Sequence, residues 1–178
     1  MDVAPPPAAR PGPSLGTEFD RVMRHPRLAL VLLCLALWLP GFFTLPATDR
    51  DESRFAQATR QMLDSGDYLR IRVGAEERNK KPAGIHWLQA GAVHAVEALG
   101  AGDRTQIWPY RLPSLLGALL AVLATFEFGR ALVGRRAALL AAAMLGSCMV
   151  LVAEAHIAKT DAALLASITA AMGLLGLA

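Results

Sequence analysis

Two carboxylates and an arginine directly follow the first apolar run of the chain. Residues 28–45 carry no charge, and Asp51, Glu52 and Arg54 come soon after them. Charged groups at the mouth of a bilayer are costly to desolvate, so they are usually retained for chemistry or for ion and lipid contacts. A carboxylate there can accept a proton from a hydroxyl or amine, and a basic side chain can hold a departing phosphate. We therefore predict a site for group transfer from a phosphate-bearing lipid.

Each of these residues also has a structural interpretation. Asp49-x-x-Glu52 and Thr48-x-x-Asp51 both fit the start of a helix, where a carboxylate needs no catalytic role. Asp49-Arg50-Asp51 is also a D-x-D, which could hold a divalent metal ion through oxygen ligands, although so short a pattern is weak. No cofactor is assigned with certainty.

Further candidates lie beyond this segment: Lys81, Arg72, His86 and Asp161. The lysine pair before Pro82 either binds phosphate or extends to lipid headgroups. Asp161 either takes part in the site or caps the helix that follows it. The histidines have no metal-like spacing, and interfacial or buried histidines are more frequent than ligands.

The composition indicates a membrane protein. Hydrophobic residues make up 54% of the chain and the mean hydropathy is +0.37, with the apolar residues gathered in long uncharged runs. The net charge of +3 comes with arginines that flank these runs, so we expect membrane lipids and not nucleic acid as partners. Cys34 and Cys148 lie inside apolar runs, and no disulfide is predicted.

We predict an all-α membrane protein with an even number of crossings between two arginine-rich segments. Arginines before residue 28 and between residues 130 and 136 place both segments in the cytoplasm. The expected parts are a disordered cytoplasmic tail at 1–20, spans at 28–45, 110–133, 137–155 and 162–178, and an extracytoplasmic loop at 46–109. Residues 83–99 should lie along or dip into the outer membrane surface, because a crossing there would make the number of crossings odd, and Glu97 and the histidines also make insertion costly. The last apolar run has no anchoring residue after it, so we expect 21–178 to be the N-terminal part of a longer polytopic domain.

The outer loop contains local signals for a helix and a turn. Thr48 or Asp49 can cap a helix that runs to about Leu63 and ends at Gly66. Residues 68–73 alternate in the manner of a short strand closed by Gly74.

Five pieces of sequence occur in order along the chain. They are the first apolar run, DESRFA at 51–56, MLxxGDYL at 62–69, KPxxxxWL at 81–88 and RLPS at 111–114. Together they resemble the polytopic lipid-dependent glycosyltransferases of the protein O-mannosyltransferase and aminoarabinose-transferase superfamily, which have the GT-C fold. Each piece alone is unspecific, but the combination covers most of the chain.

The resemblance implies a glycosyltransferase of the inner membrane. It would move a hexosyl or pentosyl group from a polyprenyl-phosphate carrier to an extracytoplasmic lipid or envelope-glycan acceptor, as in lipopolysaccharide modification or protein mannosylation. It implies that Asp51 is the catalytic carboxylate, that Arg54 and Lys81 contact the donor's lipid phosphate, and that Asp161 assists.

Glu52, Arg72 and His86 complete the set of expected substrate-binding residues. Two positions depart from the family pattern: Ala83 replaces the second proline of K-P-P, and Lys80 stands where many relatives carry an acid, which leaves a metal contact there open. This chain alone is expected to be inactive if later spans are needed. The alternative function is a non-catalytic membrane transporter or lipid-binding fragment.

Overall fold

The computed structural model describes residues 22–77 and 82–178, and these are mostly helical. The helices are α2 (Pro26–Trp38), α3 (Arg50–Ser65), α4 (Gly84–Ala98), α5 (Trp108–Leu132), α6 (Arg135–Ser147), α7 (Met149–Ala155) and α8 (Asp161–Leu177). Strands β1 (Arg72–Val73) and β2 (Glu76–Glu77) pair antiparallel. The tail predicted at 1–20 and the Lys80-Lys81 pair lie outside the described residues.

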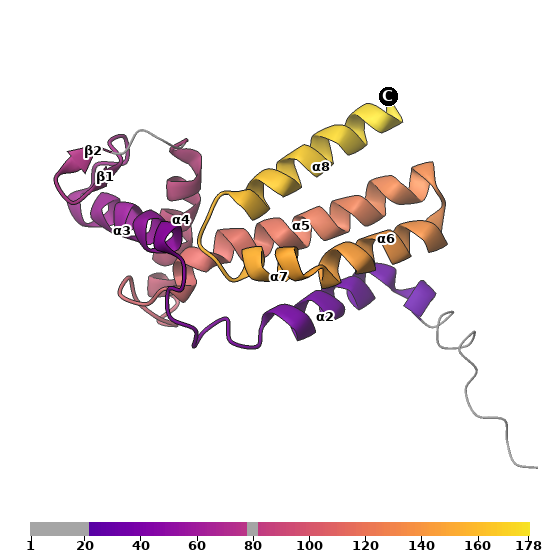
Figure 1. Ribbon diagram of the computed structural model, residues 1–178, viewed down its shortest axis with the longest axis horizontal. Helices are drawn as coiled ribbons and strands as arrows, with labels where there is room; N and C mark the ends of the chain where they lie inside the picture. The colour runs from indigo at the N-terminus through magenta and orange to yellow at the C-terminus, as the bar shows by residue number, and fades with distance from the viewer. Residues whose placement is uncertain (1–21, 78–81) are drawn as a thin grey trace, which may run out of the picture.

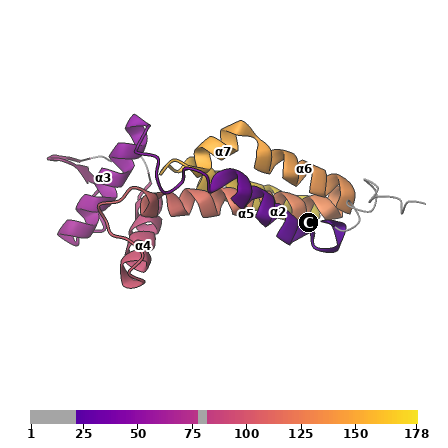
Figure 2. The same ribbon diagram turned by 90° about the horizontal axis from the view of Figure 1, so that it is seen from below.

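The long helix α5 is the centre of a helical bundle. It contacts α8, α6, α7 and α2, which run beside it, while α3, α4 and the small hairpin gather at its N-terminal end (Figure 1). In both views α4 runs across the direction of α5 (Figures 1 and 2). That is the arrangement expected if α5 crosses a membrane and α4 lies along its surface.

By length and composition, α5 is the one described helix that could cross a bilayer unaided. The pair α6 and α7 would pass the same test together but is bent by 61°, and α2 and α8 are apolar but shorter. The four spans therefore stay a prediction, although the mostly helical, apolar bundle agrees with the predicted all-α class.

The helix expected over residues 137–155 is broken at Cys148, whose backbone is extended. The indole Nε1 of Trp38 donates to the carbonyl oxygen of Gly146 at 3.0 Å, so this carbonyl is satisfied from another helix. Insertion of a side chain into the helical hydrogen-bond ladder is a common cause of a sharp kink. Gly146 also permits close packing, because a Cβ there would lie 3.0 Å from the Sγ of Cys34.

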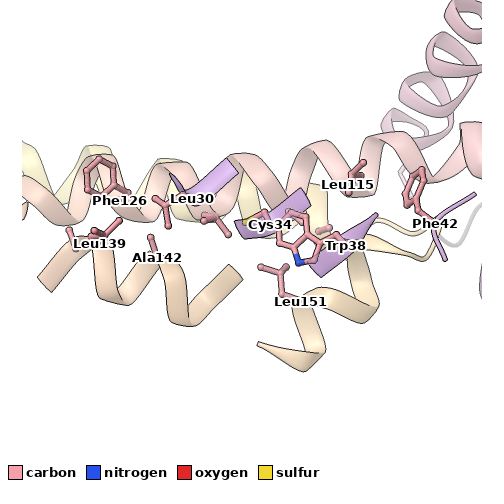
Figure 3. Close-up of a cluster of buried hydrophobic side chains, with 14 residues drawn as sticks. Leu30, Cys34, Trp38, Phe42, Leu115, Phe126, Leu139, Ala142 and Leu151 are labelled. Carbon is pink, nitrogen blue, oxygen red and sulfur yellow. The ribbon is translucent and has the colours of Figure 1, made fainter. Parts of the chain in front are cut away.

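A buried apolar cluster holds α2 against α5, α6 and α7 (Figure 3). Its larger members are Leu30, Trp38, Phe42, Leu115, Val122, Phe126, Leu139 and Leu151. Helix α2 ends near Trp38, earlier than the apolar run, because Pro40 has no backbone N–H to continue the helical hydrogen bonds. The remaining residues of the run, 40–45, turn toward α3.

The predicted helix after the first apolar run is confirmed as α3. Asp49 is its N-cap and accepts from the backbone N–H of Asp51 at 3.0 Å, and Gly66 ends it in the left-handed conformation at φ +69°. The strand expected at 68–73 is limited to β1, which pairs with β2 across the turn at Gly74.

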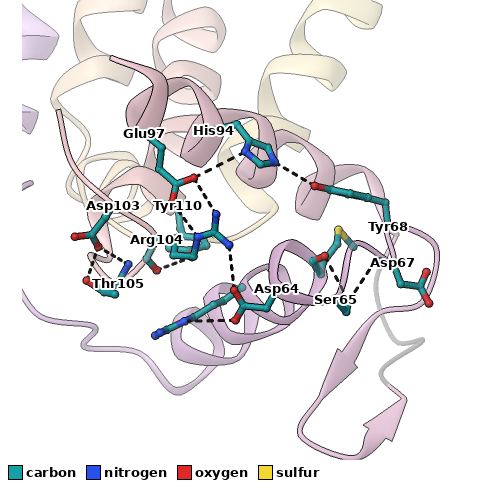
Figure 4. Close-up of polar contacts among 12 residues, drawn as sticks. Asp64, Ser65, Asp67, Tyr68, His94, Glu97, Asp103, Arg104, Thr105 and Tyr110 are labelled. Carbon is teal, nitrogen blue, oxygen red and sulfur yellow. Dashed lines mark hydrogen bonds and ion pairs between the residues drawn. The ribbon is translucent and has the colours of Figure 1, made fainter. Parts of the chain in front are cut away.

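Arg104 ties the outer segment together (Figure 4). Its guanidinium donates to Glu97 of α4 at 2.9 Å and to Asp64 of α3 at 3.1 Å. The hydrogen bond from Arg104 holds the pKa of Glu97 below its usual value. These contacts link α4 to the C-terminal end of α3.

Candidate functional site

The N-terminus of α3 meets the loop that leads into α8. The Nζ of Lys159 in that loop forms an ion pair with the Oδ2 of Asp49, the N-cap of α3. Hydrogen bonds from Lys159 and from the backbone N–H of Asp51 hold the pKa of Asp49 below its usual value. The same hydrogen bond and the charge of Asp49 raise the pKa of Lys159. One contact thus joins segments that are more than a hundred residues apart in sequence.

Asp51 and Arg54 are neighbours near the N-terminus of α3, three residues apart on the helix. The Nη1 of Arg54 is 3.8 Å from the Oδ1 of Asp51, with the side chains 40% and 55% exposed. The carboxylate is therefore accessible to an incoming molecule, and the guanidinium beside it keeps N–H groups available for an anion. This is the pair to which the family resemblance assigns acceptor activation and phosphate binding.

Asp161 opens α8, two residues after Lys159. Its carboxylate is exposed and accepts from the hydroxyl of Thr160 at 3.3 Å. Asp161 and Pro82 line the same cavity of about 400 Å³, so Pro82 lies near the start of α8. Lys81 itself is outside the described residues, and its role stays a prediction.

Glu52 is buried, although it lies next to the exposed Asp51 on α3. It forms an ion pair with Arg111 of α5, with Nε 2.7 Å from Oε1 and side chains 0% and 1% exposed. It also accepts from the backbone N–H groups of Thr48 at 3.3 Å and Ala158 at 3.2 Å. The arrangement favours a structural role for Glu52 over the substrate contact expected from the sequence.

Arg111 extends this network into the turn after α2. Its guanidinium donates to the carbonyl oxygens of Phe42, Leu45 and Pro46 at 3.1, 2.9 and 2.9 Å. Ser114, one turn later on α5, donates to the carbonyl oxygen of Lys159 at 3.1 Å. These hydrogen bonds position the two segments that carry the Asp49–Lys159 pair, namely the turn before α3 and the loop before α8.

His86 and Arg72 are not brought to this group. His86 is 1% exposed, with its Nδ1 2.8 Å from the Oγ1 of Thr59 and its ring stacked on Phe55 at 5.3 Å. Arg72 lies on β1, where it pairs with Glu77 at 3.9 Å and lines a different cavity. These placements favour a packing role for His86, and they put Arg72 on a different part of the surface from Asp51 and Arg54.

Metal binding has little support within residues 22–77 and 82–178. No group of three or more His, Cys, Asp or Glu side chains there could hold an ion. Of the D-x-D carboxylates, Asp49 is engaged by Lys159 and Asp51 lies beside Arg54.

An apolar groove runs along the bundle from the start of α8. The cavity beside Asp161 shares Leu88, Ala163 and Ser167 with a second cavity of about 450 Å³. The second cavity is bounded by α4, α5 and α8, and its lining is mostly apolar. Together the two cavities extend from Thr160 and Asp161 to apolar surface.

Lys159, Arg111 and Ser114 were not among the predicted site residues. One signal for Arg111 is present in the sequence: an arginine at the start of an apolar run needs a buried partner. No comparable signal identifies Lys159, because its partner is distant in sequence.

Comparisons with known proteins give a family and a fold. A family model described as dolichyl-phosphate-mannose-protein mannosyltransferase matches residues 80–178. No curated protein matches. The crystal structure of ArnT from Cupriavidus metallidurans in the apo state is similar over 92% of this chain and 28% of that chain, at 24% identity and a TM-score of 0.72. The structure of the same protein bound to undecaprenyl phosphate is similar over 84% of this chain and 26% of that chain, at 26% identity and a TM-score of 0.65. The chain spans about a quarter of the length of these structures.

Proposed function

The chain belongs to the dolichyl-phosphate-mannose-protein mannosyltransferase family, and from that premise we propose that it supplies part of the active site of a membrane glycosyltransferase. The enzyme would move a sugar from a polyprenyl-phosphate carrier to an extracytoplasmic lipid or envelope-glycan acceptor. The observation that carries the proposal is the Asp49–Lys159 pair, which brings the segment of Asp51 and Arg54 to the segment of Asp161. The likeness to a structure bound to undecaprenyl phosphate supports a polyprenyl carrier.

In the proposed reaction the acceptor's hydroxyl or amine attacks the anomeric carbon of the donor sugar. The bond from that carbon to the phosphate oxygen breaks, and the lipid phosphate leaves with the bonding electrons. Asp51 accepts the proton of the acceptor, for which its exposed carboxylate is suited. Arg54 binds the departing phosphate together with Lys81, where the negative charge develops.

The apolar groove beside Asp161 would receive the isoprenoid chain of the donor. Its lining between α4, α5 and α8 is mostly apolar, and the adjoining cavity has a polar end at Thr160 and Asp161. A polyprenyl phosphate is likewise divided into an apolar chain and a polar head. The match in polarity supports a lipid donor over a water-soluble nucleotide sugar.

The test is Asp51→Asn in the intact protein. The variant should lose sugar transfer at unchanged membrane abundance, because the amide cannot accept the proton. Glu76→Gln is the matched control, since it removes an exposed carboxylate from the hairpin of the same outer segment. Turnover by Asp51→Asn equal to that of Glu76→Gln would refute the assignment, and salt-sensitive lipid binding without product in the wild type would favour a non-catalytic protein.

A further inference from the structure

Four arginines line one cavity at the end of the bundle opposite the candidate site. Arg24 lies just before α2, Arg27 in its first turn, Arg130 in the last turn of α5 and Arg135 at the start of α6. The cavity has a volume of about 470 Å³. This is within the usual range for small-ligand sites, roughly 300–1,000 Å³.

The positive charge of this cavity is only partly compensated. Within the described part of the chain, Glu127 is the one carboxylate that pairs with these arginines, at 2.5 Å from Arg27 and 3.0 Å from Arg130. Among the described residues, four guanidinium groups stand against this one carboxylate, which is an excess of three positive charges. The side chains of Arg27 and Arg130 are 65% and 51% exposed, so they keep N–H donors available for an anion.

Apolar surface adjoins the charged groups. Leu28 and Phe126 line the same cavity as the arginines. A second cavity, of about 290 Å³, lies between α2 and α6, about a turn beyond Arg135, and its lining consists of apolar residues such as Leu33 and Leu140. A polar head and an apolar chain could therefore be bound side by side.

We propose that the arginine cavity binds a phosphate group, which in a bilayer is the headgroup phosphate of an anionic phospholipid. Guanidinium groups donate two parallel hydrogen bonds to phosphate oxygens, and basic pockets between helices at a membrane surface favour anionic headgroups. The acyl chain would follow the apolar cavity between α2 and α6. The inference is independent of the proposed transfer reaction, because the cavity lies at the other end of α5.

The experiment measures lipid binding to the intact, delipidated protein in an uncharged detergent by native mass spectrometry. The probes are phosphatidylglycerol, zwitterionic phosphatidylethanolamine and inorganic phosphate. Arg24→Gln/Arg130→Gln should weaken phosphatidylglycerol binding by roughly 25-fold, about fivefold for each arginine. Arg136→Gln is the matched control, because it removes the same charge from the same loop at a residue outside the cavity lining; it should leave the affinity within about twofold.

Glu127→Gln provides a test in the opposite direction. It removes the carboxylate that occupies Arg27 and Arg130, so binding of phosphatidylglycerol should become tighter. This variant tests the proposed phosphate site even if the arginine variant fails to fold. If millimolar inorganic phosphate competes with the lipid, the bound group is free phosphate. If it does not compete, the bound group is the phosphate of the lipid headgroup. Equal binding of both lipids, an equal loss in Arg136→Gln, or weaker binding in Glu127→Gln would overturn the proposal.

Discussion

Arg111 near the start of α5 and Glu52 near the start of α3 form a fully buried ion pair, with Nε 2.7 Å from Oε1. The pair also binds backbone groups of the turn after α2 and of the loop before α8. Asp51 is the residue before Glu52, so its position on α3 is set from beneath by this network. The candidate site is thus held in place by charged side chains that are themselves buried.

Removing one partner of this pair should destabilise the protein strongly. Arg111→Met leaves Glu52 buried without its counter-ion, which costs about 3–5 kcal/mol of the free energy of unfolding. The measurement is thermal unfolding in detergent, with Arg104→Met as the comparison, because Arg104 is one-third exposed in its ion pair with Glu97 and should cost less. The double variant Glu52→Gln/Arg111→Met should cost less than the sum of the single variants. Additive losses would contradict a direct coupling.

The sequence predicts α3 well because its signals are local. Asp49 and Gly66 mark the two ends through hydrogen bonds and backbone angles within a few residues. The core position of Glu52 could not be predicted in this way, since its partner Arg111 is 59 residues away. Spacing alone makes Asp51 and Glu52 equivalent acids on one helical turn, whereas the tertiary fold exposes the first and buries the second.

The same limit explains the break between α6 and α7. The run of apolar residues predicts one continuous helix, and no proline interrupts it. The break coincides with the hydrogen bond from Trp38 to Gly146, which links positions 108 residues apart. Hydrogen bonds between distant helices depend on how the helices pack together. The hydropathy of one segment gives no information about that packing.

The ion pair between Asp49 and Lys159 should contribute stability over a defined range of pH. The pKa of Asp49 is lowered by folding, so its contribution is present above the unfolded value of about 3.9 and is lost as the pH falls through the folded pKa. The pKa of Lys159 is raised, so its contribution is present below about 10.4 and is lost as the pH rises through the folded pKa.

Lys159→Met should therefore lower the melting temperature by a constant amount between about pH 5 and 9. The difference from the wild type should shrink in acid as Asp49 becomes protonated, and again in strong base. Lys159→Arg should retain most of the stability because it keeps the charge. A difference that does not vary from pH 2 to 11 would show that Lys159 acts through packing alone.

Close packing of α5 on α8 should depend on Gly117. A Cβ at this position would lie 2.7 Å from the backbone nitrogen of Ala163, and backbone cannot yield as a flexible side chain can. Gly117→Ala should lower the free energy of unfolding by about 1–3 kcal/mol as the helices separate. Gly91→Ala is the control: it lies on α4 with open space around it, so a gain in helix propensity of up to about 1 kcal/mol is expected. Equal effects of the two variants in a denaturation series would contradict the assignment of Gly117 to the helix contact.

Arg54 and Arg72 are both candidate donor contacts in the sequence, but the structure separates them. Arg54 lies 3.8 Å from Asp51 near the N-terminus of α3, whereas Arg72 pairs with Glu77 on the hairpin. Loss of a charge-assisted hydrogen bond to the lipid phosphate costs about 1.5–3 kcal/mol, so Arg54→Gln should lower kcat/KM for the polyprenyl donor by about tenfold or more. Arg72→Gln removes the same charge and should change kcat/KM by less than about twofold. The comparison requires steady-state rates of the intact enzyme against donor concentration, and an equal loss in both variants would mean that the hairpin also contacts the donor.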